Sequence, residues 1–206
     1  MTMRAGTQLE LSKREKILDA AVAVFSDRGY RATLVDEIAQ EAGVAKGTIY
    51  LYFKSKEEMY LEAFRANVEK LREQTVQRME EARSTWDKIK AFVSVPAEFG
   101  ETNKNFLRIY LTEFTGVGSI GERAPWAEEL KGILRRDSDL LREVFRKAIE
   151  TGEVREVPVE QLVTMLQYTV GGMMISRVTD IRLSDDNLDP EMIVDLFRQW
   201  LRPVGT

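Results

Sequence analysis

The chain has 206 residues, of which 44% are hydrophobic, so it is long enough to build a packed core in one large domain or two small ones. It contains neither cysteine nor histidine, which excludes disulfides, zinc fingers and catalysis by Ser-His-Asp or Cys-His groups. The formal net charge of −4 argues against binding to nucleic acid, but residues 1–54 hold eight Lys or Arg against seven Asp or Glu, a local net charge of +1.

The remaining composition favours a cytoplasmic protein without a membrane anchor. No apolar stretch approaches the roughly 20 residues that cross a bilayer, and residues 1–16 lack the apolar segment of a signal peptide. No pattern of residues indicates a metal site, a cofactor or a catalytic centre, so we do not expect an enzyme.

The first part of the chain predicts three helices. One lies between Ser12, which can cap it, and Gly29, which ends it. A second opens at Thr33, where "TLVD" has the spacing of a capping box, and ends at Gly43. A third, short helix begins at Val44. Apolar residues at helical spacing form the inner faces of the three helices: Ile17, Ala20, Ala21, Val24 and Phe25; Val35, Ile38, Ala39 and Ala42; Val44, Ile49 and Phe53.

The rest of the chain also reads as helix, so the fold class is all-α. We expect a long helix over about 55–83 and further helices over about 85–96, 104–115 and 125–151, with the last two beginning near Pro158 and Pro190. No period-2 strand of any length is present, because runs such as "VREVPV" are short and contain proline.

The second and third helices, joined by "EAGVA", have the arrangement of a helix-turn-helix, in which Gly43 permits the positive φ angle of the turn. Several polar or small side chains then project outward from the third helix and suit phosphates and base edges: Lys46, Gly47, Thr48, Tyr50 and Tyr52. Taken singly, the tyrosines could be packed aromatics and Lys46 a solvated lysine.

Residues 12–65, above all "GYRATLVDEIAQEAGVAKGTIYLYFKSKEEMY", resemble the N-terminal domain of the TetR family of bacterial transcriptional regulators. The resemblance implies a homodimer that binds a palindromic operator in double-stranded DNA and responds to a small-molecule effector. It divides the chain into a DNA-binding domain, 1–54, and a helical domain for effector binding and dimerisation, 55–206.

The resemblance also implies roles for single residues. Thr33, Tyr50 and Lys56 would contact phosphates. Lys46, Gly47 and Thr48 would face bases. Tyr52 would contact a base or a phosphate, and Lys54 would reach the DNA backbone. Some members of the family place a base-reading arginine where this chain has Asp36, and we expect Asp36 to cap its own helix instead.

Aromatic and acidic residues on helical faces of the larger domain are candidates for a mostly apolar effector pocket. These are Phe64, Trp86, Phe92, Phe106, Tyr110, Glu113, Phe114, Trp126, Asp137 and Tyr168. Plain core packing is the alternative for the aromatics, and exposure at the edge of an apolar stripe is the alternative for the two acids. The stretch "GVAKGTIYLYFKSKEEM" is similar to regulators of fatty-acid degradation within the family, which makes a fatty acyl-CoA the first effector to consider.

The last two helices are strongly apolar, which suits a dimer interface. The candidates are Leu162, Leu166, Val170, Met173, Ile193, Phe197 and Trp200. Core packing within one chain is the competing account.

The sequence therefore favours a ligand-responsive repressor. The alternatives are a helical small-molecule carrier or enzyme with a relic DNA-binding domain, and a regulator controlled by a protein partner.

Overall fold

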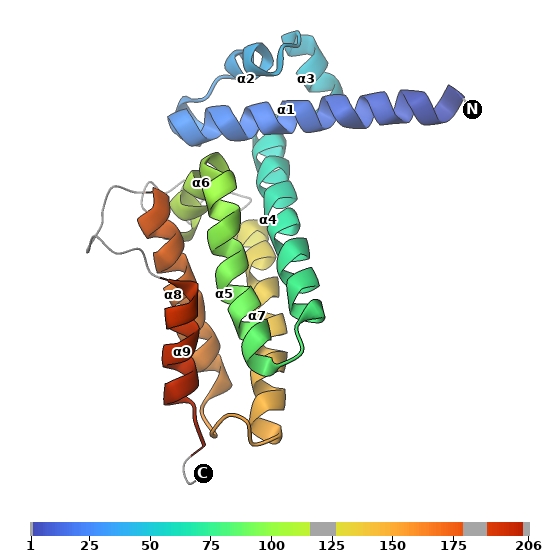
Figure 1. Cartoon of the computed structure of the whole chain (residues 1–206). Coiled ribbons are helices and arrows are strands. Elements are labelled where there is room, and N and C mark those ends of the chain that lie inside the picture. The colour runs from blue at the N-terminus through green and yellow to red at the C-terminus, as the bar shows by residue number, and fades with distance from the viewer. Residues whose placement is uncertain (1, 116–126, 179–188, 204–206) are drawn as a thin grey trace. The chain divides into compact units, whose positions relative to one another are not determined.

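The computed structural model describes residues 2–115, 127–178 and 189–203, which form nine α-helices and no β-strand (Figure 1). The helices are α1 Thr2–Ala32, α2 Val35–Ala42, α3 Lys46–Tyr52, α4 Lys56–Glu81, α5 Thr85–Thr102, α6 Lys104–Thr115, α7 Ala127–Glu150, α8 Val159–Val178 and α9 Pro190–Trp200. The expected all-α fold is thus confirmed. None of these helices is long and apolar enough to span a bilayer.

Several helix boundaries differ from the predicted ones, among them the start of α1, the start of α2 and the end of α5. Helix α1 begins ten residues earlier than Ser12 and is interrupted at Gly29, whose φ of 75° and ψ of 161° are not helical. Helix α2 begins at Val35, two residues after Thr33. Helix α5 continues beyond Pro96 to Thr102, although a proline inside a helix removes one intrahelical hydrogen bond, because the residues around it are buried.

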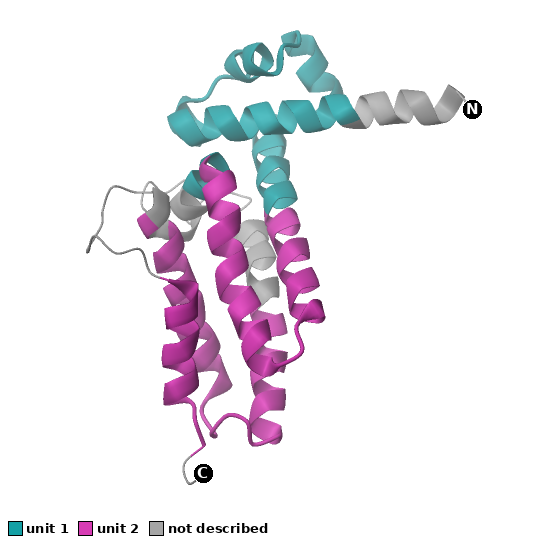
Figure 2. Cartoon of the chain, viewed as in Figure 1, with its two compact units in different colours: residues 1–67, 105–130 teal, residues 68–104, 131–206 magenta. Residues whose placement is uncertain are grey.

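The chain forms two compact units, shown in teal and magenta in Figure 2. The first contains residues 1–67 and 105–130, and the second contains residues 68–104 and 131–206. Helix α4 contributes its first turns to one unit and the rest to the other, and α6 belongs to the first unit. The two compact units divide after residue 67, within α4, whereas residue 54, the expected end of the DNA-binding domain, lies in the loop between α3 and α4; that functional boundary stays a prediction.

The core of the first unit joins α1, α2, α3 and the start of α4. Phe25 of α1 lies edge-on to Tyr60 of α4, with ring centroids 4.9 Å apart, and Tyr30 lies 5.0 Å from the same ring. Helix α6 reaches this unit through Phe106, whose ring centroid lies 5.7 Å from that of Phe64. All of these side chains except Tyr30 are buried, so α4 is the element on which α1 and α6 both pack.

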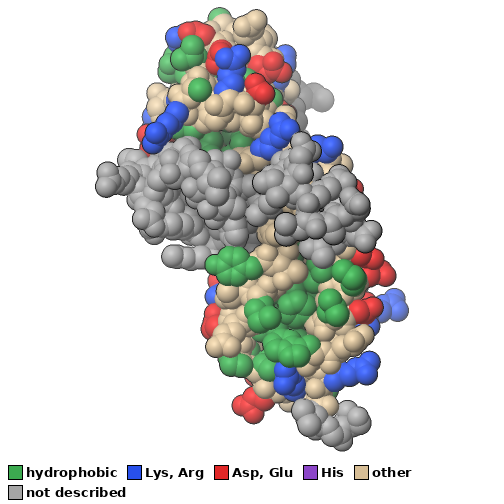
Figure 3. Space-filling view, turned by 90° about the vertical axis from the view of Figure 1, so that its left-hand side faces the viewer, with side chains coloured by type: hydrophobic (Ala, Val, Ile, Leu, Met, Phe, Trp, Pro, Cys, Tyr) green, Lys and Arg blue, Asp and Glu red, His purple; other side chains and the backbone are tan. Residues whose placement is uncertain are grey.

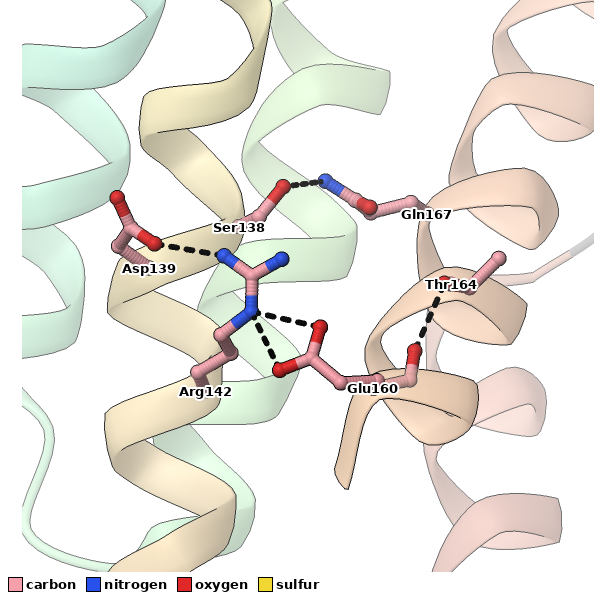
Figure 4. A network of polar contacts seen from close by, with 6 residues as sticks. All are labelled: Ser138, Asp139, Arg142, Glu160, Thr164 and Gln167. Carbon is pink, nitrogen blue, oxygen red and sulfur yellow. Dashed lines mark hydrogen bonds and ion pairs between the residues drawn. The ribbon is translucent and has the colours of Figure 1, made fainter. Parts of the chain in front are cut away.

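The core of the second unit is built around α5, which packs against α8 and α9. Large, fully buried side chains of this core come from α5, α7 and α8: Ile89, Leu141, Phe145, Leu162 and Leu166. A polar network joins α7 to α8 (Figure 4). There, Arg142 donates through Nε to both carboxylate oxygens of Glu160 at 2.9 Å and through Nη1 to Asp139 at 2.6 Å, and Gln167 donates to Ser138 at 2.7 Å.

Candidate DNA-binding surface

The turn between α2 and α3 follows directly from its glycine. Gly43 has a φ of 65° and a ψ of 38°, a left-handed conformation that side chains with a Cβ rarely adopt. In this conformation its N–H donates to Gln40 O at 3.1 Å, and the N–H of Val44 donates to Ala39 O at 2.9 Å. These bonds satisfy carbonyls at the end of α2, so the glycine both ends α2 and sets the direction of α3.

Helix α3 is held in place by two buried side chains. Ile49 and Phe53 are each 1% exposed, and the Phe53 ring lies under the guanidinium of Arg14, 5.2 Å from the ring centroid. Arg14 is itself fixed by an ion pair with Glu62 of α4. Because Ile49 and Phe53 are buried on one side of α3, the opposite side of this helix is presented to solvent.

That opposite side carries most of the residues expected to contact DNA. Lys46, Gly47 and Tyr50 are exposed, whereas Thr48 and Tyr52 are half-buried. Nothing lies within 4 Å of the position where a side chain on Gly47 would begin. These five residues therefore form one accessible surface on a short helix, as predicted; their contacts with DNA stay a prediction.

Lys46 is tied to α2 by an ion pair. Its ammonium donates to Asp36 Oδ2 at 2.8 Å, and both side chains are more than half exposed. The hydrogen bond to Asp36 raises the pKa of Lys46, so its charge persists at any physiological pH. Asp36 does not cap α2 as we expected; the carboxylate of Glu37 accepts from the N–H of Leu34 at 3.0 Å instead.

Lys54 follows α3 and leads into α4. Its side chain is exposed, and its backbone N–H donates to the carboxylate of Glu58. Glu58 in turn donates its own N–H to Ser55 Oγ at 3.1 Å, which completes a capping arrangement at the start of α4. The exposed Lys54 side chain thus extends from a backbone held by this capping arrangement, just after α3, and its contact with the DNA backbone stays a prediction.

Two residues expected at phosphates, Thr33 and Lys56, make contacts within the chain, and their contacts with phosphate stay a prediction. Thr33 is 0% exposed, and both its hydroxyl and its N–H donate to Gly29 O, at 2.8 and 3.3 Å. Its carbonyl accepts from Lys56, so the residue holds the chain between α1 and α2 and offers no free donor in this structure. The sequence pattern placed Thr33 at a helix start, but that start lies two residues later.

The ammonium of Lys56 closes the end of α1. It donates to Tyr30 O at 2.8 Å and to Thr33 O at 2.9 Å, and it lies over the Tyr30 ring, 4.6 Å from the centroid. Partial burial lowers the pKa of Lys56, while the carbonyls and the ring face replace part of the lost water. A cation is favoured at this place because a helix C-terminus carries partial negative charge and unpaired carbonyls.

The outward side of α3 also carries Leu51, which the sequence reasoning overlooked. Its side chain is 82% exposed, although leucine is usually buried. The helical period could have revealed it, because Leu51 lies two residues after the buried Ile49 and so about 200° around the helix axis.

The second unit presents a separate apolar surface, here called the α8–α9 face. It is formed by exposed large side chains from two helices: Met165 and Tyr168 of α8, and Met192, Leu196 and Trp200 of α9. Figure 3 shows apolar side chains gathered on this side of the second unit. The guanidinium of Arg155 lies over the Trp200 ring, 4.9 Å from the ring centroid, and so fixes the orientation of this ring within the single chain.

Most of the residues named for the dimer interface lie beneath this face. Leu162, Leu166, Val170, Met173 and Ile193 are buried within a single chain, so the competing account of core packing describes them. Phe197 is half-buried, and Trp200 is 48% exposed. Helices α8 and α9 therefore carry enough exposed apolar surface to pair with a second copy. Apart from Trp200, however, the exposed residues are not those named for the interface but residues close to them in the sequence.

The candidates for the effector pocket do not form one described site. Phe64 and Phe106 pack together in the first unit, Trp86 and Phe92 lie in the second, and Tyr168 is 68% exposed on the α8–α9 face. Tyr168 therefore lines no internal pocket in this chain. The side chains of Tyr110, Glu113, Phe114, Trp126 and Asp137 lie outside the described residues.

A hollow of about 490 Å³ lies on the second unit between the end of α4, α5 and the start of α9. Its lining is rich in charge, with ion pairs between Arg78 and Glu98 and between Lys90 and Glu191. Such a lining differs from the mostly apolar pocket expected for a hydrophobic effector.

Residues 17–63 match the family model described as bacterial regulatory proteins, tetR family. The chain is 31% identical over 144 residues to the fatty acid metabolism regulator protein of Bacillus subtilis, which covers 70% of this chain and 72% of that relative.

Solved structures share the fold over almost the whole chain. The fatty acid degradation regulator FadR from Bacillus halodurans superimposes with a TM-score of 0.74 at 26% identity, covering 91% of this chain and 93% of that one. FadR from Bacillus subtilis, solved in complex with stearoyl-CoA, superimposes with a TM-score of 0.75 at 24% identity, covering 90% and 95%.

Proposed function

The chain belongs to the TetR family of bacterial regulatory proteins, and from that premise we propose that it is a repressor that binds a palindromic operator as a homodimer and leaves it when a hydrophobic or amphiphilic effector binds. The observation that carries the proposal is the side of α3 opposite the buried Ile49 and Phe53. It is rigidly backed and accessible, and it bears donors suited to phosphates and base edges. The repressor would act in the cytoplasm, beside the bacterial chromosome.

Two copies are required because seven residues of helix contact too few bases to define a genomic site. The usual solution places two recognition helices in successive major grooves, about 34 Å apart. The α8–α9 face supports this assembly, since exposed Trp200, Tyr168 and Leu196 would lose apolar surface on pairing with a second copy. Exposed Gly172 lies one turn after Tyr168 and has no neighbour within 4 Å, so it would let the partner helix approach closely.

Fatty acyl thioesters are the effector class that we propose. The support is the role in fatty acid metabolism of the relative that is 31% identical over most of this chain. Acyl chains also match the hydrophobic or amphiphilic character expected of the effector from the aromatic residues of the larger domain.

The effector signal would pass along α4. Phe64 of α4 packs against Phe106 of α6. Helix α4 also begins with Lys56, whose ammonium donates to the carbonyl of Tyr30 at the end of α1 and to the carbonyl of Thr33 just before α2. A shift of α4 would therefore move the support of the helix-turn-helix. The effector must bind the DNA-incompetent state better, and about 1.4 kcal/mol of coupling gives a tenfold loss of operator affinity.

The test is selection of bound duplexes from random DNA, followed by anisotropy titrations on the selected site. We expect an inverted repeat, a dissociation constant that rises steeply with salt, and release by palmitoyl-CoA or stearoyl-CoA but not by free coenzyme A. Failure to select any duplex would overturn the DNA-binding proposal. Retained operator affinity at saturating acyl-CoA would overturn the effector class and favour another ligand or a protein partner.

A further inference from the structure

Leu51 is the most exposed large apolar residue of the described chain, at 82%. It contributes little to the fold, because a side chain so exposed packs against almost nothing. It also lies on the same side of α3 as Gly47, one turn earlier, where nothing occupies the space above the backbone. Single exposed leucines are common on protein surfaces, so exposure alone means little.

The neighbours of Leu51 give its exposure a specific meaning. Lys46, Thr48 and Tyr50 on the same helix supply hydrogen-bond donors, whereas leucine can neither donate nor accept. The small profile of Gly47 and the projecting Leu51 together form an apolar strip along the middle of the exposed side of α3. A major groove offers one apolar group to such a strip, the C5 methyl group of thymine.

We propose that Leu51 reads a thymine in each half-site of the operator by packing against its C5 methyl group. This inference rests on the proposed function, because it assigns the base that one residue of the DNA-binding surface selects. The contact excludes water from both groups and discriminates thymine from cytosine, which presents an amino group and no methyl group at that edge of the base pair. Tyr50 and Lys46, by contrast, recognise the DNA by hydrogen bonds.

The experiment removes the methyl group and nothing else. Each thymine of the selected operator is replaced in turn by deoxyuridine, symmetrically in both half-sites, and the affinity of the wild-type protein is measured by anisotropy. One position should lose about fourfold per half-site, or roughly 15-fold for both, as expected from about 0.8 kcal/mol for one buried carbon group.

The variant Leu51→Ala, combined with the deoxyuridine substitutions, completes a double-mutant cycle between the protein and the DNA. It should bind the unsubstituted operator more weakly and lose its sensitivity to deoxyuridine at that one position only, while thermal stability stays unchanged because the side chain is exposed. Leu34→Ala is the matched control, since Leu34 is an exposed leucine at the start of α2, and it should keep the wild-type deoxyuridine profile.

The possible failures can be told apart. Absence of binding to the unsubstituted operator would overturn the proposed function itself. Tight binding with a flat deoxyuridine profile, or a sensitive position that persists in Leu51→Ala, would overturn the role of Leu51 and leave the proposed function intact. Equal losses on all sequences for Leu51→Ala would mean that it packs against deoxyribose, which also overturns the inference.

Discussion

Gly47→Ala should make the protein more stable and its DNA binding weaker. Gly47 lies inside α3 with ordinary helical geometry, and a Cβ there would meet no atom within 4 Å. Alanine should therefore stabilise the fold by about 0.4–1 kcal/mol, since it restricts the unfolded chain and favours helix. For a chain of this length, that gain raises the melting temperature by roughly 1–4 °C.

The same methyl group would stand where α3 approaches the floor of the major groove. Crowding in a packed interface costs about 1–3 kcal/mol, which corresponds to a loss of operator affinity between about fivefold and 150-fold. The assays are thermal unfolding and anisotropy on the selected operator, with Gly47→Ser and Gly47→Val as larger side chains at the same site. Affinity should fall with side-chain size while the melting temperature does not follow it. A more stable Gly47→Ala variant with full operator affinity would refute the close approach of α3 to DNA.

Three further substitutions test the assignments made from contacts. Asp36→Ala should remove the carboxylate that pairs with Lys46, so the affinity of the dimer for its operator should rise. An unchanged slope of log K against log salt would agree with the expected contact of Lys46 with base edges, whereas a slope steeper by about 1.8, or 0.9 for each of the two copies, would place Lys46 at phosphates instead. Lys56→Met should lower the melting temperature by roughly 4–12 °C, because it loses hydrogen bonds to two carbonyls that contribute about 2–3 kcal/mol. The slope of log K against log salt should stay unchanged. An unchanged melting temperature with a shallower slope would make Lys56 a phosphate contact. Tyr168→Asp should sediment as a monomer and keep its native helix content in circular dichroism. The control Gln77→Asp, at an exposed site on α4, should stay dimeric. An intact Tyr168→Asp dimer would place the interface elsewhere.

The helices were predictable because apolar spacing and glycine act locally. Gly43 ends α2 as expected, since its left-handed conformation follows from its lack of a Cβ. The contacts of Lys56 with Tyr30 and Thr33 were not predictable, because they join residues more than 20 positions apart. A lysine near a DNA-binding motif looks the same in sequence whether it holds phosphate or the end of a helix.

The exposed face of α8 could not be read from the sequence for a different reason. This helix carries apolar residues on both sides, with Leu162 and Leu166 inside and Met165 and Tyr168 outside. A hydrophobic period distinguishes the inner side of a helix only when the outer side is polar. Which side of α8 is exposed depends on the helices that pack against it, and only the tertiary structure shows these.

Tethered cleavage of the operator tests the central claim most directly, because the chain has no cysteine and a single introduced thiol is unique. Iron-EDTA would be attached to Ala45→Cys, at the exposed start of α3, and to Ala66→Cys, an equally small substitution at an exposed site on α4. The account predicts two clusters of strand cleavage from position 45, related by the two-fold axis of the inverted repeat, and little cleavage from position 66. Cleavage from position 66 with none from position 45 would contradict it.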